Sequence, residues 1–529
     1  MLRYVLPALL FFPAAVSVAQ SPAGETSLPT EGLIDASKPV DASKPVGSEL
    51  QWNEAEGPMK PIATSLSEEE IKAIIGEYLS DKEKAKAASM TPEEKKKKAS
   101  AMTARWNDGL ELSTEDKNFR THVGGRYQFD SAWFGAPDNV NNTINVPYGD
   151  GVDFRRARMR IDGTLYDVHE YAVEFDFVNS VRVRNQPGTA GFFDQTVTAP
   201  TDLWWQIKKV PVVGNIKFGN HKEQIGFEHI VSSRFQPFME RSFNQDAFYG
   251  GLFNGFQPGI SIFNTYGNDE NGVWNLGLFK PASNVFANAT GDGDYALSGR
   301  LTRLLAYSDE GRQLLHVAVS GRQGTAVSQA GVPGRFQTYR TRDAIRSGLS
   351  ANWSVPAGIT LIGDDTQMVN GELVGVYGPL TWQSEYLVSG LQDARLNLGD
   401  PGQTVTYHGG YAQVGLFLTG ENDSYEKKTG AFGRVRPNCN FFKPDRCGGG
   451  TGCGAWQLVA RYNHLDLNDK GLNGGILDAY TAGLNWFWNP NMKLQFNYNV
   501  TDRNVSQVVG RETGSGNIYS YGARMAMDF

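Results

Sequence analysis

The sequence FRRARMRIDGTL, residues 154–165, brings basic side chains together at a spacing that could bind anions. Successive side chains of a β-strand point to opposite faces. As a strand, the stretch places Arg156, Arg158 and Arg160 on one face, while the other face carries only apolar side chains and glycine. A guanidinium group stays charged and offers forked donors, so it suits oxyanions. The stretch predicts either a soluble sheet with its arginines in water or a membrane barrel with its arginines in a water-filled pore.

In a pore, these three arginines would form a ladder with steps of about 6.5–7 Å along the strand. Weak sites in series lower the barrier for an anion that enters and still let it leave, which is the general logic of channel selectivity. The alternative is that Asp162, Glu174 and Asp176 neutralise the arginines across the lumen and leave only a transverse field. The sequence alone leaves both interpretations open.

The composition favours a β-rich protein. The 529 residues include 60 Gly, 21 Tyr, 29 Phe and 11 Trp, and 20% are charged, a balance that suits strands better than helices. No run of roughly 18 or more apolar residues follows the N-terminus, which excludes a helical membrane protein. The alternating strands of a membrane barrel escape such a search. The net charge of −7 lies largely in the N-terminal part, and the near-neutral remainder argues against nucleic-acid binding.

The N-terminal part divides into three segments before a strand pattern begins. Residues 1–19 are expected to be a secretory signal peptide, with Arg3 before an apolar stretch and small residues at the cleavage site. Residues 20–66 are too polar to bury a core, so we expect a flexible linker. Capping boxes at Ser67 and Thr91 predict helices within 67–105. A narrow apolar stripe makes this helical segment a candidate periplasmic coiled coil.

From residue 117 to Phe529 the hydrophobic pattern has a period of two. Apolar residues alternate with polar ones over 492–501, and residues 519–529 repeat the pattern and end on phenylalanine, as bacterial outer-membrane barrels usually do. Turn signals such as Asn489-Pro490-Asn491 separate some runs, whereas longer Gly- and Asn-rich loops separate others. Short turns at one end and long loops at the other predict an all-β fold, a transmembrane antiparallel β-barrel over 117–529.

Several blocks in this region resemble one family, the phosphate-selective porins O and P. The blocks are FRRARMRIDG at 154–163, IKFGNHKEQIGFEHIVSSRFQPFMERSF at 216–243, YGPLTWQSEY at 377–386, FLTGENDSYEKKTGAFGRVRP at 417–437, GAWQLVARYNHLDLND at 454–469, and GGILDAYTAGLNWFWNPNMKLQFNY at 474–498. They occur in the family's order. The resemblance implies a trimeric barrel of about 16 strands, in which a long loop folds into the lumen and forms a constriction.

The resemblance also places a central anion site. It implies that Arg155 and Arg156 take part, together with Lys217 on the polar face of its strand and residues of the inserted loop SSRFQPFMER; Lys222 and His229 fall near further lysine positions of the family. The candidate anion-binding and pore-lining residues are Arg155, Arg156, Arg158, Arg160, Lys217, Ser232, Ser233 and Arg241. Strict alternation would put only one of two neighbouring arginines inside, so we expect a bulge or a strand end at Arg155.

The expected function is passive diffusion of small anions through the bacterial outer membrane. Arg158 stands where the family has an aromatic residue, and the inserted loop carries three glutamates, so the chain favours small anions in general over phosphate alone. The expected partners are phosphate or related anions, outer-membrane lipid and two further copies in a homotrimer, with no nucleic acid. The alternatives are a general or substrate-specific solute porin, an energy-coupled outer-membrane transporter and an outer-membrane hydrolase.

No motif in the sequence predicts an enzyme, a cofactor or a metal site. The sequence has no nucleophile elbow, P-loop or dinucleotide-binding motif. Cys439, Cys447 and Cys453 have spacings of eight and six, which differ from the paired spacing of a zinc ribbon. In an exported protein we therefore expect one disulfide in this loop and one free thiol.

Overall fold

Two helices come first in the part of the chain that the structure describes. This computed structural model describes residues 68–144, 146–184, 192–249, 255–281, 286, 293–329, 332–346, 354–442, 451–505 and 514–529. Helix α1 spans Glu68–Ser89 and α2 spans Pro92–Ala99. Thr91 Oγ1 accepts a hydrogen bond from the backbone of Glu94, and the Glu94 carboxylate accepts one from the backbone of Thr91 at 2.8 Å, which confirms the second capping box. The expected signal peptide, the linker and Ser67 lie outside the described residues.

A β-hairpin follows the helices, where the sequence predicted helix up to residue 105. Strand β1 spans Met102–Trp106 and β2 spans Leu110–Thr114, and the two pair antiparallel. The prediction of helix over 102–105 is therefore wrong. The local reason is the Asp108-Gly109 dipeptide, a strong hairpin-turn signal that lies between two strands containing β-favouring residues. β2 also pairs with the first barrel strand, so the sheet begins earlier than residue 117.

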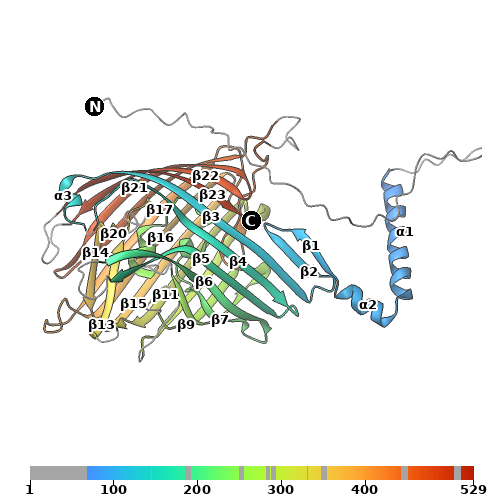
Figure 1. The fold of residues 1–529 in the computed structure, drawn as a ribbon, viewed down its shortest axis with the longest axis horizontal. Helices are drawn as coiled ribbons and strands as arrows, with labels where there is room; N and C mark the ends of the chain where they lie inside the picture. The colour runs from blue at the N-terminus through green and yellow to red at the C-terminus, as the bar shows by residue number, and fades with distance from the viewer. Residues whose placement is uncertain are drawn as a thin grey trace, which may run out of the picture. The chain divides into compact units, whose positions relative to one another are not determined.

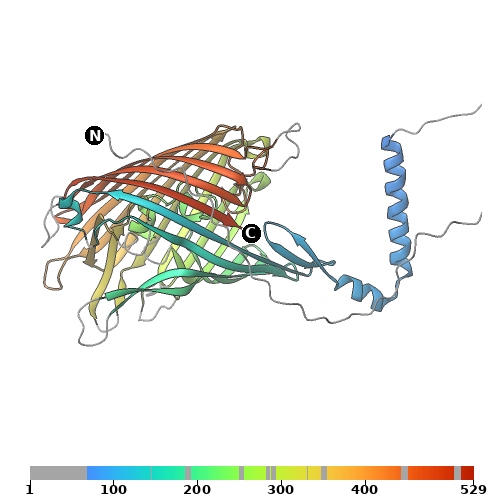
Figure 2. The ribbon, with the colours of Figure 1, turned by 45° about the horizontal axis from the view of Figure 1, so that its top comes forward.

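Sixteen further strands close into an antiparallel barrel, seen in Figures 1 and 2. In chain order they are β3 (Phe119–Gly135), β4 (Gly151–Leu165), β5 (His169–Arg184), β6 (Phe192–Val210), β7 (Gly214–Lys222), β8 (Phe256–Tyr266), β9 (Gly272–Phe279), β10 (Ala296–Ser308), β11 (Gln313–Thr325), β15 (Asp365–Tyr377), β16 (Leu380–Ala394), β17 (Gln403–Phe417), β20 (Ala455–Asp469), β21 (Leu472–Asn489), β22 (Met492–Asn504) and β23 (Gly516–Asp528). β23 pairs with β3 and closes the ring. The predicted barrel and its strand number are confirmed.

The connections differ between the two ends of the barrel. At one end they are mostly short, such as 166–168 between β4 and β5, and the turns there include the 3₁₀ helices η3 (Asn268–Glu270) and η4 (Asp309–Gly311). At the other end they are mostly long; 136–150 holds helix α3 (Asp138–Asn141). Outer-membrane barrels keep their short turns in the periplasm, so the end that carries the C-terminus is the periplasmic end.

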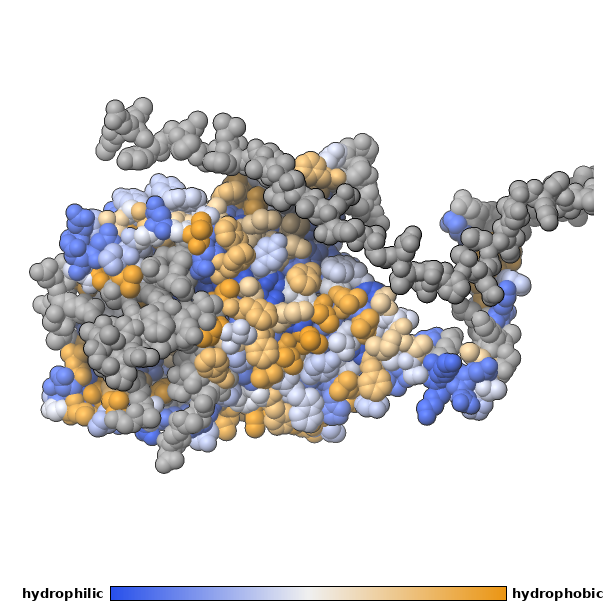
Figure 3. Space-filling view, viewed as in Figure 1, coloured by the Kyte–Doolittle hydropathy of each residue, from blue (hydrophilic) through white to orange (hydrophobic). Residues whose placement is uncertain are grey.

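Side chains of the barrel strands alternate between the outer wall and the lumen. In β4, Met159 and Ile161 are exposed on the outer wall, while Arg156 and Arg158 are buried inside. Figure 3 shows apolar residues gathered over the barrel flank that faces the viewer. A wall of this kind suits lipid, because the apolar side chains face outward and the polar ones face inward.

Outward aromatic side chains lie at two heights on the wall. Trp456 of β20 stacks on Trp486 of β21 with ring centroids 4.7 Å apart, close to the periplasmic end. Six residues further along β20, Tyr462 packs on Tyr480 at 5.2 Å. Six residues along a tilted strand span about 15 Å of wall height, less than the roughly 25 Å of the apolar band, so the tryptophan pair near the periplasmic end is the one that fits a membrane interface. None of the helices in the described ranges is long and apolar enough to cross a membrane.

Three connections fold back into the barrel. Residues 223–255 hold α4 (Phe227–Ile230) and the π-helix η1 (Gln245–Tyr249); 326–364 hold the small sheet of β12 (Val327–Gln329), β13 (Val332–Thr341) and β14 (Ala357–Ile362); 418–454 hold β18 (Tyr425–Glu426) and β19 (Ala431–Phe432). The ring of Phe227 packs on that of Phe432 at 4.9 Å, and Phe248 packs on Tyr339 at 6.1 Å. The inward-folded segments therefore contact one another and fill much of the lumen, as the predicted constriction requires.

The cysteines in 418–454 are in two states. Cys439 is disulfide-bonded, whereas Cys453 is an exposed free thiol. This confirms the expected combination of one disulfide and one free thiol; Cys447 lies outside the described residues. Within the described ranges, no group of three or more His, Cys, Asp or Glu side chains could hold a metal ion.

A buried ion pair joins the first and last strands of the barrel. Arg524 of β23 donates from Nε and Nη2 to the two carboxylate oxygens of Asp130 on β3, both at 2.6 Å. The two side chains are 1% and 0% exposed. Removing one partner of such a pair leaves a buried charge uncompensated, which costs about 3–5 kcal/mol. This ion pair therefore stabilises the closure of the barrel between β23 and β3.

We expect Asp130→Asn to lower the stability of the barrel by about 3 kcal/mol, because Arg524 keeps Glu240 as its remaining carboxylate. The measurement is the urea midpoint of unfolding in detergent micelles, followed by the loss of the β-sheet circular dichroism signal. The double variant Asp130→Asn with Arg524→Gln should recover part of the loss, since neither charge of the pair is then left. An unchanged midpoint in the single variant would show that the pair does not stabilise closure.

Candidate anion-binding site

A β-bulge in β4 brings Arg155 and Arg156 to the lumen together. Arg156 pairs in register with Gln128 of β3, and the next pair along the strands joins Phe154 to Phe129. Arg155 is therefore the extra residue of the bulge. Its side chain is 11% exposed and reaches Glu240 in the inward-folded segment 223–255. The bulge expected from the two adjacent arginines is confirmed.

The lumen side of β4 borders a cavity of about 540 Å³. Among the residues predicted for the anion site, the cavity lining includes Arg156, Arg158, Arg160, Lys217, Ser232, Ser233 and Arg241. Arg155 is not part of that lining, because its guanidinium group is turned to Glu240. The structure therefore brings seven of the eight predicted residues around one cavity. They come from β4, β7 and the inward-folded segment 223–255.

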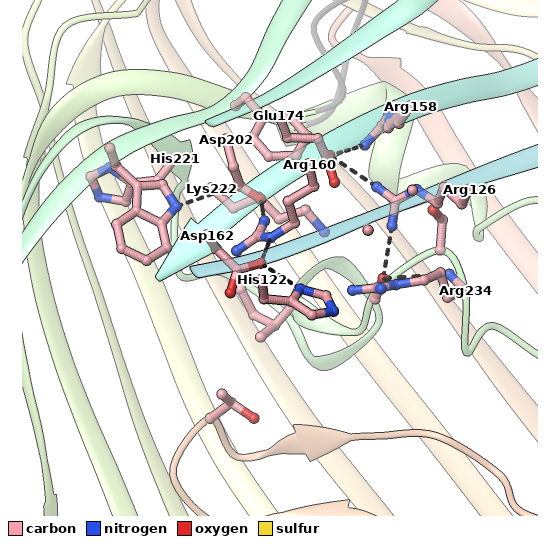
Figure 4. A pocket seen from close by; sticks show the side chains of 18 of the residues that line it. His122, Arg126, Arg158, Arg160, Asp162, Glu174, Asp202, His221, Lys222 and Arg234 are labelled. Atoms are coloured by element: carbon pink, nitrogen blue, oxygen red, sulfur yellow. Dashed lines mark hydrogen bonds and ion pairs between the residues drawn. The ribbon is translucent and has the colours of Figure 1, made fainter. Parts of the chain in front are cut away.

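Basic residues outnumber acidic residues around this cavity. The lining contains the basic residues Arg120, Arg126, Arg156, Arg158, Arg160, Lys217, Lys222, Arg234 and Arg241, and the acidic residues Asp108, Asp162, Glu174 and Asp202. Nine basic side chains therefore face four acidic ones. Figure 4 shows the acidic side chains interleaved with the basic ones. The electrostatics of the cavity depend on which basic groups these carboxylates neutralise.

Two arginines of the predicted ladder are each held by two carboxylates. Arg158 donates to Asp176 at 2.7 Å and to Glu174 at 3.1 Å. Arg160 donates to Asp162 and to Asp202, both at 2.9 Å. For Arg158 and Arg160 the geometry therefore matches the alternative interpretation of the sequence, in which carboxylates oppose the arginine row. The pairs fix the direction of these side chains and remove most of their excess charge.

Three other basic groups of the lining are held by uncharged partners. Lys217 Nζ lies 4.1 Å from the ring centroid of Trp204, in cation–π geometry. Lys222 donates to a backbone carbonyl at 2.5 Å. Arg241 donates to two backbone carbonyls at 2.9 and 2.6 Å. In the part of the chain that the structure describes, none of the three forms an ion pair with a carboxylate.

Four buried polar atoms of the cavity lining, one of them His122 Nε2, also have unused hydrogen-bonding capacity among the described residues. Arg126 Nε, Arg156 Nε and Ser233 Oγ belong to lining residues, and each is without a hydrogen-bond partner among the described residues. The nearest carboxylate contact of Arg156 is 3.8 Å from Glu240. Buried polar groups are almost always hydrogen-bonded. Free donors beside basic groups of uncompensated charge are the arrangement that an oxyanion or ordered water would satisfy.

One glutamate of the inward-folded segment 223–255 lies within ion-pair distance of four guanidinium groups. Glu240 contacts Arg155 at 2.7 Å and Arg524 at 2.8 Å, and it contacts Arg346 and Arg156 at 3.3 and 3.8 Å. Burial alone would raise the pKa of Glu240, but these four positive groups hold the pKa well below its usual range. The carboxylate therefore stays charged, and it ties the segment to β4, to β23 and to the inward-folded segment 326–364.

Some cavity residues were missed by the sequence reasoning. Arg126 lies on the polar face of β3, and Arg234 directly follows the predicted pair of serines. Ser232 Oγ accepts hydrogen bonds from both, at 3.1 Å from Arg126 and 3.3 Å from Arg234. Strand parity could have identified Arg126, whereas the position of Arg234 depends on how the inward-folded segment turns. His229, near a lysine position of the family, is buried and donates from Nδ1 to Gln245 Oε1 at 2.9 Å, away from the cavity lining.

We expect Glu240→Gln to loosen the inward-folded segment, since four arginines lose their shared carboxylate. Single channels in planar bilayers should then show a larger and noisier conductance than the wild type. Glu223→Gln is the matched control: it lies in the same segment but forms one ion pair, with Arg322 at 3.1 Å. Equal conductance and noise in the two variants would contradict the anchoring role of Glu240.

Comparisons with known proteins agree with this architecture. A family model described as phosphate-selective porin O and P matches residues 122–525. An uncharacterized protein of Caulobacter vibrioides is 29% identical over 448 residues, which cover 82% of this chain and 78% of that protein. Porin O of Pseudomonas aeruginosa is 24% identical over 422 residues, which cover 74% of this chain and 84% of that protein.

Solved porin structures are also similar to the chain. The Salmonella typhi OmpF complex with daunomycin has a TM-score of 0.46 at 10% identity, covering 81% of this chain and 100% of that chain. An anion-selective porin from Comamonas acidovorans has a TM-score of 0.41 at 11% identity, covering 78% of this chain and 100% of that chain. Because the family model spans most of the sequence, this chain is a bacterial outer-membrane porin that belongs to the phosphate-selective porin O and P family.

Proposed function

We propose that this porin lets small anions diffuse passively through its lumen, and that they bind in transit in the cavity beside β4. The observation that carries the proposal is the charge of the lining, in which nine basic side chains face four acidic ones. A cavity with low-dielectric walls and an excess of positive charge concentrates anions and repels cations. No energy source is needed, because each site only has to bind weakly and release.

The proposed binding groups are those whose charge or donors remain free. Lys217, Lys222 and Arg241 supply charge without a carboxylate partner among the described residues, and Arg156 supplies a free Nε–H. Ser233 adds a hydroxyl donor without adding charge. An anion held by several such groups can pass from one to the next without crossing an uncharged stretch of wall.

Arg155, Arg158 and Arg160 have a supporting role in this proposal. Their carboxylate partners hold Arg158 and Arg160 against the wall, where they contribute a field but little affinity. Arg155 anchors the inward-folded segment through Glu240. Ser232 is occupied by Arg126 and Arg234, so it orients these two groups toward the cavity.

Phosphate-type oxyanions are the small anions that these groups suit best. Guanidinium and hydroxyl donors match the several oxygens of a tetrahedral anion, and the family carries phosphate selectivity in its name. The second candidate function is a general solute porin. The ion pairs of Arg158 and Arg160 with carboxylates favour this second function, since opposed rows of charge mainly create an electric field across the lumen.

We expect Lys217→Gln and Arg156→Ala each to lower the permeability of anions relative to cations. A hydrogen bond to a charged group contributes about 1.5 kcal/mol, which corresponds to roughly tenfold in anion affinity. The measurement is the reversal potential of the full chain in planar bilayers under a salt gradient. Lys209→Gln is the matched control, because Lys209 is 65% exposed near the periplasmic end of β6 and is not part of this cavity lining. Reversal potentials that match this control would refute the assignment.

We further propose that the chain assembles as a homotrimer and that the two N-terminal helices aid assembly. In α1 the apolar side chains Ile74, Ile75, Tyr78 and Leu79 are all more than half exposed. An apolar stripe of this kind on a helix is stable in water only when another surface covers it. Equivalent helices of neighbouring copies would supply such a surface.

Deleting residues 68–99 should weaken the trimer while leaving the β1–β2 hairpin and the barrel intact. We expect a larger monomer fraction when detergent-solubilised protein is diluted, measured as oligomer mass by light scattering. The substitution pair Glu93→Gln with Lys96→Gln, on exposed faces of α2, is the control and should leave the mass unchanged. If the deletion variant has the oligomer mass of the wild type at every dilution, the helices do not aid trimer assembly.

A further inference from the structure

The turn of the β1–β2 hairpin lies in the wall of the pore. β23 pairs with residues 126–135 of β3, and β2 pairs with residues 120–123 of the same strand. The hairpin thus continues the sheet where the last barrel strand ends, at the periplasmic mouth. Its turn residues Asn107 and Asp108 line the cavity beside β4. A segment outside the sixteen barrel strands therefore contributes to the conduction path.

The hairpin is held against the wall by specific contacts. Glu111 of β2 is 1% exposed; it lies 3.5 Å from Arg120 of β3 and also accepts a hydrogen bond from Asn107 of the turn at 2.8 Å. Gly109 has φ of +153°, and a Cβ there would lie 2.4 Å from the ring of His122. Only glycine permits so close an approach of the turn to the wall. Its neighbour Asp108 is therefore placed at a fixed position in the mouth.

Asp108 neutralises two arginines of the inward-folded segment 418–454. Its Oδ2 lies 3.2 Å from Arg434 Nε and 3.1 Å from Arg436 Nη2. Arg434 is also bound by Asp528 at the end of β23. Arg436 is 64% exposed, and Asp108 is its carboxylate partner in the described part of the chain. The hairpin thus controls the charge of a segment that enters the lumen from the periplasmic side.

A second cavity of about 670 Å³ continues from the first toward the periplasm. The two cavities share lining residues, among them Asp108, Ser232 and Arg234. The second lining contains the basic residues Arg234, Arg312, Arg434 and Arg436, and the acidic residues Asp108, Glu421 and Glu426. Four basic side chains therefore face three acidic ones there, compared with nine and four in the first cavity. The positive excess falls sharply toward the periplasmic mouth, and Asp108 belongs to both linings.

We propose that the β1–β2 hairpin forms the periplasmic exit of the pore and that Asp108 determines how readily an anion is released there. Asp108 keeps Arg434 and Arg436 from becoming a further anion site below the cavity beside β4. An anion that leaves the first cavity then meets a nearly neutral mouth and passes into the periplasm. This inference rests on the proposed function in anion diffusion.

The test compares Asp108→Asn with Asp167→Asn in the full chain. Both are turn aspartates at the periplasmic end with positive φ, +53° and +56°, a conformation that asparagine tolerates. Both pair with basic side chains, but Asp167 pairs with Lys208 and Lys209 and lines neither cavity. Reversal potentials in potassium chloride gradients and conductance against inorganic phosphate concentration are measured in planar bilayers.

We expect Asp108→Asn to raise the anion-to-cation permeability ratio roughly two- to fivefold, the range that a partly exposed ion pair allows. The phosphate concentration at half-saturation should fall by a similar factor, because anions are held longer at the mouth. Arg436→Gln should shift the ratio in the opposite direction, and Asp167→Asn should leave it at the wild-type value. The sign of the wild-type reversal potential tests the proposed function separately. If Asp108→Asn and Asp167→Asn give the same reversal potential, the exit proposal is overturned whatever that sign is.

Discussion

The shared ion pair of Glu240 with four arginines holds the pore in shape. The carboxylate reaches β4, β23 and the segment 326–364 from a chain segment that has no strand of its own in the wall. A segment without main-chain pairing to the barrel needs strong side-chain contacts to stay inside it, and buried charge-assisted pairs supply them. Without that anchor, the cavity beside β4 would lose one of its walls, since Arg241 and Ser233 belong to the same segment.

The positive groups of the lumen divide into two kinds by their partners. Arg158 and Arg160 are fixed by pairs of carboxylates, whereas Lys217 and Arg241 contact only an aromatic ring or backbone carbonyls. The first kind is fixed to the wall by ion pairs, and the second kind is the one we propose to contact a passing anion. Basic side chains of one lumen can thus differ in role, because strand register and the inward fold decide which partner lies beside each of them.

The barrel could be predicted from the sequence because apolar and polar residues alternate with a period of two, which shows which side chains share a face of a strand. The family resemblance placed two adjacent arginines in the lumen and so predicted a bulge or a strand end at Phe154–Arg155, and the structure has the bulge. The sequence could not reveal that Asp202 and Glu240 neutralise Arg160 and Arg155, because these partners are brought close only by strand register and by the inward fold. The hairpin at 102–114 was missed for a different reason: its five-residue strands are too short for a clear alternation.

A uniformly basic lumen would conduct poorly, because an anion that binds tightly at every step cannot leave. The pore instead combines a strongly positive cavity with a nearly neutral one toward the periplasm. The decrease arises because four basic side chains line the second cavity against nine in the first, while the acidic side chains number three and four. In the proposed mechanism, attraction inside the membrane and release at its edge use different parts of the chain, and the turn of the short N-terminal hairpin lines the cavities at that edge.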